Sequence, residues 1–203
     1  MGKVVFNTSI SLDGFVAGPN DGPSNGLGDG GEHLHDWGFN GSVEIRLAED
    51  HMPLKVSPQS AALLKEEVAN YGAMVFGRRT FDIVNDWEGH PPMRPCFVVT
   101  HHAPPEWVKP GSPFIFVTDG VESAIRQAQR AAGDKNVVVA TASILQQALK
   151  VGLVDELYLE QAPLLLGGGV RLFDNLGAQP IALERFNVVA APGVTHLRFR
   201  VVR

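Results

Sequence analysis

The sequence has little cysteine, no long apolar run and no excess of positive charge. Cys96 is the single cysteine among 203 residues, so a disulfide framework is excluded. No apolar run approaches the ~20 residues that a membrane-spanning helix needs. The formal net charge of −5 argues against a general nucleic-acid or membrane-surface binder. The start Met1-Gly2-Lys3 leads into an apolar strand rather than a signal peptide, so we expect a cytoplasmic protein.

The chain does contain a regular alternation of short apolar runs and helix-compatible segments. Hydrophobic residues make up 44% and charged residues 19%, as in ordinary globular proteins. The order of elements predicts an α/β fold, a three-layer sandwich with a mostly parallel central sheet that ends in an antiparallel C-terminal hairpin. No linker or repeat divides the chain, so residues 1–203 are expected to form one domain. The predicted strands are 3–10, 73–76, 95–100, 114–117, 136–140, 157–161, 181–190 and 195–202, and the predicted helices are 57–71, 80–85, 121–132 and 144–151.

The segment Gly77-Arg78-Arg79-Thr80 follows directly on the buried strand 73–76 and begins a helix. In an open α/β sheet, ligands bind at the carboxyl ends of the strands. The free N–H groups of a helix N-terminus favour an anion there, and two arginines add charge suited to phosphate. The segment is therefore a candidate phosphate site. A solvated arginine pair in a turn is the alternative.

Two further strands end in polar residues, Thr100-His101-His102 and Ala140-Thr141-Ala142-Ser143. If the strands are parallel, these tips lie on one edge of the sheet together with residues 77–80. Their hydroxyl, imidazole and helix N-terminal groups fit a phosphorylated nucleotide. The first strand ends in a turn that would bring Asp13 to the same edge.

The segment 15–42 is rich in Gly, Pro, Asn and Asp, and we expect a long loop with little regular structure, which is typical of a lid or binding loop. Its G-x-G-x-x-G match at 26–31 lacks a preceding strand, so we reject a dinucleotide motif. His33 and His35 could contribute to a metal site, but alternate residues of a Gly-rich loop fix no geometry, and we predict no metal. Residues 44–51 are read as a short helix or a loop.

Four motifs occur in an order that resembles a known family: Ser11-Leu12-Asp13-Gly14, Gly77-Arg78-Arg79-Thr80-Phe81, Gly152-Leu153-Val154-Asp155-Glu156-Leu157 and Leu165-Leu166-Gly167-Gly168-Gly169-Val170-Arg171-Leu172-Phe173. Together they resemble the dihydrofolate-reductase-like superfamily, in its branch related to the C-terminal reductase domain of the bifunctional riboflavin-biosynthesis deaminase-reductase. The chain lacks the H-x-E and P-C-x-x-C zinc motif of a deaminase. We therefore expect a stand-alone reductase-like domain at most. The resemblance also implies a homodimer, which members of this family often form.

The resemblance implies a reductase that uses NADPH to transfer hydride to a small heterocyclic substrate, either pterin-like or like a pyrimidine precursor of riboflavin. Asp13 is the implied residue for substrate orientation or proton handling, with a simple turn residue as the alternative. Glu160 and a water molecule are the other candidate proton donors, although the alternation of strand 157–161 favours a solvated face for Glu160. The residues implied to contact the cofactor are Ile10, Ala17, Gly77, Arg78, Arg79, Thr80, Thr100, His101, Ala140, Thr141, Ala142 and Ser143.

The chain departs from this family at one position. Family members commonly carry Gly-Gly where this sequence has Ala140-Thr141, and two glycines let the backbone approach a pyrophosphate closely. The Thr141 hydroxyl could donate a hydrogen bond to the cofactor instead. The alternatives to a reductase are a non-catalytic nucleotide- or ligand-binding protein that retains the fold, and a metal-dependent enzyme that uses His33 and His35.

Overall fold

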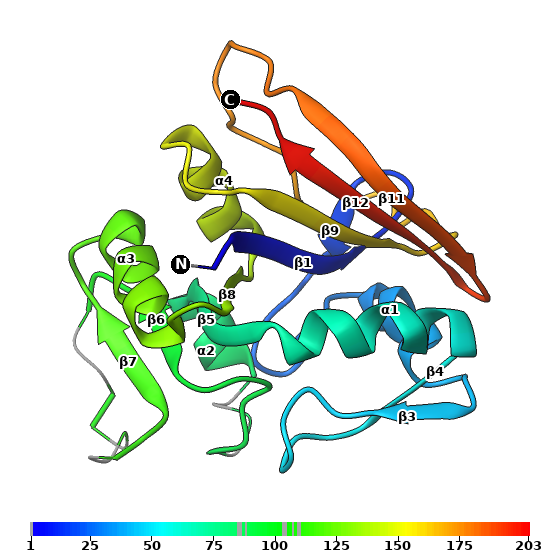
Figure 1. Ribbon diagram of the computed structural model, residues 1–203, viewed down its shortest axis with the longest axis horizontal. Helices are drawn as coiled ribbons and strands as arrows, with labels where there is room; N and C mark the ends of the chain where they lie inside the picture. The colour runs from blue at the N-terminus through cyan, green and yellow to red at the C-terminus, as the bar shows by residue number, and fades with distance from the viewer. Residues whose placement is uncertain (1, 85–86, 88, 103–104, 107, 109–110) are drawn as a thin grey trace.

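The computed structural model describes residues 2–84, 87, 89–102, 105–106, 108 and 111–203 (Figure 1). An eight-stranded sheet runs through this part of the chain in the order β11-β12-β9-β1-β8-β5-β6-β7. Strands β9, β1, β8, β5, β6 and β7 are parallel, and β12 and β11 continue the sheet as an antiparallel hairpin. The predicted mostly parallel sheet with a C-terminal hairpin is therefore confirmed. The strands are β1 Val4–Ile10, β5 Tyr71–Gly77, β6 Cys96–Val99, β7 Phe114–Val117, β8 Asn136–Val139, β9 Glu156–Gln161, β11 Leu183–Ala191 and β12 Val194–Val201.

Helices cover both faces of the sheet and complete the three layers. Helices α3 (Val121–Ala132) and α4 (Ala142–Lys150) pack on one face, where they share the largest core cluster with β1, β5 and β8. Helix α1 (Pro58–Ala69) lies on the other face, and Ser57 caps it by accepting a hydrogen bond from the Ser60 N–H at 3.1 Å. This cap followed by proline is the signal that predicted the helix.

Helix α2 (Arg78–Ile83) begins two residues earlier than predicted, so both Arg78 and Arg79 lie in its first turn. The expected end of this helix near residue 85 lies outside the described residues. Phe81 anchors α2 by packing edge-on against Phe114 and Phe116.

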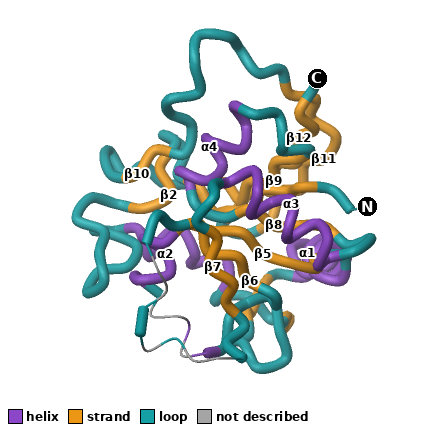
Figure 2. The backbone as a smooth tube through the Cα atoms, turned by 90° about the vertical axis from the view of Figure 1, so that its left-hand side faces the viewer, coloured by secondary structure: helices purple, strands orange, loops and turns teal. Residues whose placement is uncertain are grey.

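The expected long loop at 15–42 contains more regular structure than its composition indicates. β2 (Phe15–Ala17) pairs with β10 (Val170–Arg171), as Figure 2 also shows, and the 3-10 helix η1 spans Gly31–Gly38. Beyond the loop, β3 (Val43–Ile45) pairs with β4 (Leu54–Val56), so the reading of 44–51 as a helix or loop is wrong at its start. Apolar residues within the segment explain why it forms regular structure. Leu34, for example, is fully buried and packs η1 against the rest of the molecule.

Strand β9 corrects a second expectation. Its alternation predicted one solvated face with Glu160 on it, but Glu156, Tyr158 and Glu160 are all buried. The reason is tertiary: His196 and Arg198, which bind Glu160, contact Ser60 and Glu67 of α1, whereas Glu156 is bonded by Lys3 and Tyr158. Polar residues on a covered face must find partners there.

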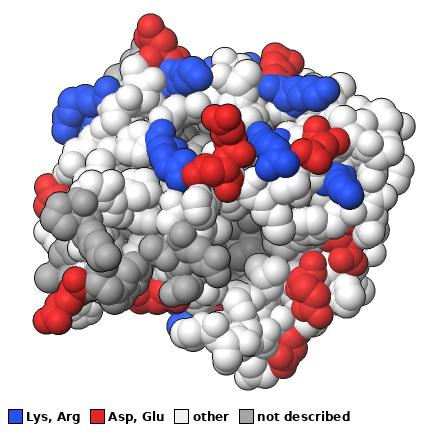
Figure 3. Space-filling model, turned by 90° about the horizontal axis from the view of Figure 1, so that it is seen from below, with Lys and Arg blue, Asp and Glu red and all other residues white. Residues whose placement is uncertain are grey.

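On the face seen from below, basic and acidic side chains are mixed in one part and acidic side chains prevail in another (Figure 3). In Figure 3, Lys and Arg side chains alternate with Asp and Glu across the upper part of the face that is seen from below. Within the described residues, no helix combines the length and the apolar character that crossing a membrane requires.

Candidate functional site

The three predicted strand tips do meet at one edge of the sheet. β5, β6 and β8 are parallel neighbours, with Gly77 paired to Val99 and Val75 to Val139, so they end at nearly the same level. A Cβ atom on Gly77 would lie 3.5 Å from the Thr141 Oγ1 atom. The tips of β5 and β8 are therefore in contact, and the first turns of α2 and α4 begin beside each other.

Thr141 is the most unusual residue of this edge. Its φ of +76° lies in the left-handed region that a β-branched residue rarely adopts. Its Oγ1 atom is shielded from solvent and is the one buried side-chain polar atom without a hydrogen-bond partner among the described residues. It is the N-cap residue of α4, yet its side chain makes no capping bond. A strained residue with an unpartnered hydroxyl fits a position where a ligand supplies the missing acceptor.

The two arginines of the edge have carboxylate partners in this structure. Arg78 Nε donates to Asp82 Oδ1 at 2.9 Å within α2. Arg79 Nε donates to Asp21 Oδ2 at 3.1 Å, and its Nη2 donates to the Asp21 carbonyl oxygen at 2.7 Å. Arg79 thus ties α2 to the 18–30 loop, and a bound phosphate would share or replace the Asp21 contact.

The other implied cofactor residues fall into two groups. Thr80 is half-buried, whereas His101 and Ser143 are exposed at the edge, where an extended ligand can reach them. Ile10, Ala17, Thr100 and Ala142 are buried. Thr100 Oγ1 accepts a hydrogen bond from the His102 N–H at 3.1 Å, so it orders the tip of β6.

The Asp13 side chain binds the backbone of the 163–169 segment, which is distant in the sequence. Its carboxylate accepts hydrogen bonds from the Ser11 hydroxyl at 2.6 Å and from the N–H groups of Leu166 at 3.1 Å and Gly167 at 2.7 Å. The Ser11 hydroxyl, together with these backbone N–H groups, lowers the pKa of Asp13 to about 2. Asp13 is therefore ionised at neutral pH, and its partners point to positioning of the 163–169 segment rather than to proton donation.

This arrangement gives a prediction for Asp13→Asn. Because the folded-state pKa of about 2 lies below the usual 3.8, the stabilisation by Asp13 is complete above about pH 4 and is lost as the pH falls through 2. We expect wild type to be more stable than Asp13→Asn at pH 7, with the difference disappearing toward pH 2. Urea unfolding of both proteins at several pH values measures this, and a difference that does not change with pH would contradict it.

A cavity of about 260 Å³ lies against the sheet on the side covered by α1. β1 contributes Asn7, Thr8 and Ser9, β9 contributes Glu160, and η1 contributes Trp37, whose Nε1 donates to Ser9 Oγ at 3.1 Å. The rest of the wall is mostly apolar and comprises Gly38, Phe39, Leu47, Leu54, Leu64, Val68, Met74, Pro92, Met93, Val138 and Ala140, together with His35 and Tyr71. Since Ala140 immediately precedes Thr141, the cavity adjoins the edge described above.

Behind the cavity wall lies a buried charged cluster, formed by Glu67, Glu160, His196 and Arg198. Glu160 Oε2 is hydrogen-bonded to His196 Nδ1, and Glu160 Oε1 accepts from Arg198 Nη2 at 2.8 Å. Arg198 also donates to Glu67 through Nε at 2.5 Å and Nη2 at 3.1 Å. His196 Nε2 lies 2.8 Å from the Ser60 hydroxyl of α1.

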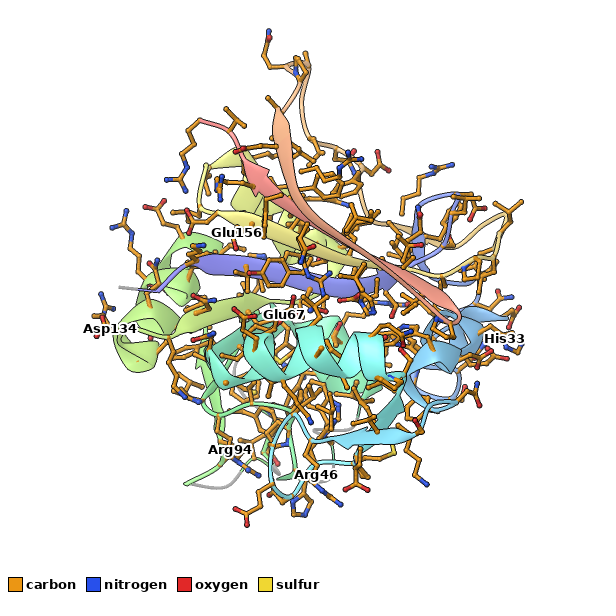
Figure 4. All side chains as sticks on the ribbon, turned by 45° about the vertical axis from the view of Figure 1, so that its right-hand side comes forward. His33, Arg46, Glu67, Arg94, Asp134 and Glu156 are labelled. Atoms are coloured by element: carbon orange, nitrogen blue, oxygen red, sulfur yellow. The ribbon has the colours of Figure 1, made fainter. Side chains whose placement is uncertain are left out.

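Burial dominates the electrostatics of this cluster. It raises the pKa of the Glu67 carboxyl, although the Arg198 guanidinium opposes the shift. Figure 4 shows Glu67 between α1 and the sheet, on the side of the helix away from solvent. Of the four groups, Glu160 is the one that also lines the cavity. The cluster therefore places a fixed carboxylate at the cavity wall.

The sequence contained a signal for this cluster that its alternation pattern concealed. Ser9, Glu160 and His196 are direct neighbours on β1, β9 and β12, and Arg198 is paired with Tyr158 in the next row. Acidic residues on one predicted strand and basic residues on the neighbouring hairpin strand can indicate cross-strand pairing. The sequence does not show that α1 buries the row.

The histidines considered for a metal site are not brought together. His33 is exposed and points outward in Figure 4, with its Nδ1 3.0 Å from Asp36 Oδ2. His35 is partly buried and faces the cavity. In the part of the chain that the structure describes, no group of three His, Cys, Asp or Glu side chains is arranged to hold a metal ion.

These features define a class of protein. A mostly parallel sheet with a terminal antiparallel hairpin, helices on both faces and polar tips at the carboxyl edge form a dihydrofolate-reductase-like fold. The family model described as the RibD C-terminal domain matches residues 2–197, and the chain belongs to this family. The resemblance drawn from the four motifs is confirmed. This family is a reductase domain, and membership in it supports the assignment of the chain as an oxidoreductase.

Solved structures share the fold. A protein from Shewanella sp. PV-4 assigned to riboflavin biosynthesis matches over 100% of both chains, with a TM-score of 0.70 and 23% identity. The Thermotoga maritima diaminohydroxyphosphoribosylaminopyrimidine deaminase/5-amino-6-(5-phosphoribosylamino)uracil reductase matches over 99% of this chain and 57% of its own, with a TM-score of 0.61 and 13% identity. Enterococcus faecalis dihydrofolate reductase, complexed with NADP(H), matches over 100% of this chain and 98% of its own, with a TM-score of 0.55 and 13% identity. A direct sequence comparison with curated proteins finds no match.

Proposed function

We propose that this protein is an NADPH-dependent reductase that transfers hydride to a C=N or C=O group of a small heterocycle bound in the cavity. The observation that carries the proposal is the junction at Ala140-Thr141. Ala140 lines the cavity, and the next residue places an unpartnered hydroxyl between the N-termini of α2 and α4. A phosphate site and an apolar pocket therefore adjoin, as a dinucleotide cofactor and its substrate require.

The residues at the edge fit a cofactor phosphate. The Thr141 hydroxyl and the N–H groups of the first turn of α4 would hold the pyrophosphate, and the first turn of α2 would contribute Arg79. Exposed His101 lies where it could meet a 2′-phosphate. Bound NADPH would supply the hydride, while the protein supplies binding and orientation.

The chain's own residues would complete the site in three ways. Leu54, Leu64 and Met74 line the cavity and would shield a bound ring from water. Asp13 fixes the 163–169 segment beside the turn after β1. The hydrogen-bonded atoms Glu160 Oε2 and His196 Nδ1 can hold a proton at the cavity wall, which makes this pair a better candidate donor than Asp13.

Titration with NADPH and NADH tests the proposal, with Thr141→Val as the main variant. Valine keeps the β-branched shape but removes the hydroxyl. We expect Thr141→Val to bind NADPH about 10-fold or more weakly, because a hydrogen bond to a charged group contributes roughly 1.5–3 kcal/mol. The same change should leave the stability of the free protein equal or higher, since an unsatisfied buried hydroxyl is removed.

Thr195→Val on β12 is the matched control, because two strands, β9 and β1, lie between its strand and β8, which leads into Thr141. It should leave both quantities unchanged. Calorimetry with each cofactor and thermal melting of each variant provide the two measurements. If wild type binds neither cofactor at millimolar concentration, the reductase assignment falls and the non-catalytic ligand-binding protein becomes the better description.

The homodimer implied by the resemblance stays a prediction. Leu183, Phe186 and Val188 on the edge strand β11 each expose about two-fifths of their surface, at 42%, 43% and 45%. An apolar edge strand is compatible with pairing to a second copy.

A further inference from the structure

The buried charged cluster continues into α1 through two hydroxyl groups. His196 Nε2 lies 2.8 Å from Ser60 Oγ, and Ser60 Oγ lies 3.0 Å from Ser57 Oγ. At the other end, His196 Nδ1 is hydrogen-bonded to Glu160 Oε2. Ser60, His196 and Glu160 are each 2% exposed or less, and Ser57 is 7% exposed. The four side chains thus form one continuous line of hydrogen bonds through the interior of the protein.

The two ends of this line reach different hollows of the molecule. Glu160 lines the cavity described above. Ser57 lines a second hollow, the outer pocket, which lies between the start of α1, the end of η1 and the Pro192-Gly193 turn that joins β11 to β12. Trp37 lines both spaces, and its ring stands edge-on to His196 at 5.4 Å between the ring centres. The hydrogen-bonded line therefore runs beside the side chain that the two hollows share.

Every group along the line can both give and take a proton. A hydroxyl donates one hydrogen bond while it accepts others, and a neutral imidazole accepts at one nitrogen and donates at the other. Ser57 Oγ accepts from the Ser60 N–H at 3.1 Å, so its own proton is free to point at Ser60 Oγ. When Ser60 donates to Nε2, His196 carries its proton on Nδ1, facing Glu160. All the bonds can therefore point from the outer pocket toward the cavity.

The charge of the cluster favours the uptake of one proton. Two carboxylates, Glu67 and Glu160, share the single guanidinium of Arg198, which leaves a formal charge of −1 when His196 is neutral. These four residues are at most 9% exposed. A net charge in such surroundings is unfavourable, and one added proton removes it.

Reduction of a C=N or C=O group consumes a proton as well as a hydride, because carbon takes the hydride and the neighbouring N or O takes the proton. A ring that fills the cavity would be shielded from water on its apolar side by Leu54, Leu64 and Met74. Replacement of the proton then needs a path that the bound ring does not block. The line from Ser57 reaches Glu160 from behind the cavity wall.

Resting on the proposed reductase function, we infer that Ser57, Ser60 and His196 form a relay that carries protons from the outer pocket to Glu160. The substrate takes a proton from the Glu160 carboxyl. His196 then passes its Nδ1 proton to Glu160 while Nε2 takes the Ser60 proton, Ser57 reprotonates Ser60, and solvent water reprotonates Ser57. Each O–H or N–H bond that breaks is matched by one that forms, so one proton passes from solvent to substrate. Rotation of the hydroxyls and return of His196 to its Nδ1–H tautomer reset the line.

Exchange of the His196 Nδ1 proton with solvent tests the relay without substrate or cofactor. NMR of the ¹⁵N-labelled protein measures this exchange, and the loss of the signal in His196→Gln identifies it. We expect Ser60→Ala to slow the exchange about 10-fold or more, because it cuts the line of hydroxyls. Ser60→Thr retains a hydroxyl and should restore most of the wild-type rate, which a purely structural role of Ser60 does not predict.

Two further measurements separate the relay from other causes. The Ala61 N–H, which donates to the Ser57 carbonyl oxygen at 2.8 Å, serves as an internal reference, so that opening of α1 is divided out of each rate. Ser9→Ala is the matched control, because Ser9 lies beside Glu160 on β1 and lines the cavity but is not part of the relay. It should leave the exchange rate unchanged. An unchanged rate in Ser60→Ala, or equal slowing in Ser9→Ala, would overturn the relay.

Ser57→Asn keeps the test decisive if Ser60→Ala does not fold. Asparagine is as good a helix cap as serine, but it has no hydroxyl to pass a proton on. It should slow the exchange as Ser60→Ala does, and wild-type exchange in this variant would count against the relay.

The relay and the reductase function can fail separately. Slowed exchange in Ser60→Ala without binding of NADPH to wild type would keep the proton path and remove the reductase that it serves. Binding of NADPH together with unchanged exchange in Ser60→Ala would keep the reductase and remove the relay.

Discussion

Arg198→Ala is expected to lower the free energy of unfolding by about 3–5 kcal/mol, because it leaves buried carboxylates without their cation. Arg198 is 1% exposed and donates to both Glu67 and Glu160. Its removal deprives two carboxylates, each less than one-tenth exposed, of their shared partner. The remaining charge cannot reach water without moving α1 away from the sheet.

Arg200→Ala is the control two residues along the same strand. Arg200 donates to Glu184 at 2.8 Å, but both side chains are more than half exposed. Exposed ion pairs typically contribute about 0.2–1 kcal/mol, so we expect a small change. Urea unfolding of both variants measures the contrast. Equal losses for Arg198→Ala and Arg200→Ala would show that the cluster is not a buried electrostatic unit.

The combined variant Glu67→Leu with Arg198→Met separates charge from packing. Replacing a buried ion pair by apolar residues of similar size is often neutral or stabilising, whereas breaking it is not. The double variant should therefore be more stable than Arg198→Ala, and it leaves Glu160 hydrogen-bonded to His196. A double-mutant cycle with the two single variants gives the coupling directly.

The parts of the fold that the sequence predicted are those set by local signals. Ser57 followed by Pro58 caps α1 through contacts within one turn. The apolar run before Gly77 and the polar residues after it fix both the strand and its tip. Because parallel strands end at one edge, finding the strands was enough to bring residues 77 and 141 together.

The features that the sequence did not predict depend on contacts between segments that are distant in the chain. Glu160 looked solvated because its own strand alternates, but α1, encoded about ninety positions earlier, covers it. Asp13 looked like a turn residue or a catalytic acid, yet two of its partners lie 153 and 154 positions away. Thr141 gave no sign of its left-handed backbone, because β-branched residues rarely adopt it. Tertiary contacts decided each of these cases.

The second large effect that we expect on stability concerns the triple glycine Gly167-Gly168-Gly169. Gly169 has a φ of +116°, and a Cβ atom there would lie 2.0 Å from the Ala17 carbonyl oxygen and 2.6 Å from the Gly18 carbonyl carbon. These are backbone atoms of β2 and the residue after it, so they cannot move aside as a side chain could. Gly169→Ala combines backbone strain with overpacking, each of which costs roughly 1–3 kcal/mol. We therefore expect a loss of about 2–6 kcal/mol in unfolding free energy.

Gly168→Ala, one residue earlier, separates this effect from a general need for glycine. Its nearest atom would be Pro19 Cγ at 3.4 Å, an ordinary contact with a side chain. A compatible Gly→Ala change restricts the unfolded chain, so stability should stay equal or rise by up to about 1 kcal/mol. Since Gly169 packs on Ala17, which is an implied cofactor residue, Gly169→Ala should also weaken NADPH binding while Gly168→Ala does not. Urea unfolding and NADPH titration of both variants test this, and similar behaviour of the two would show that β10 and β2 do not dock as the structure has them.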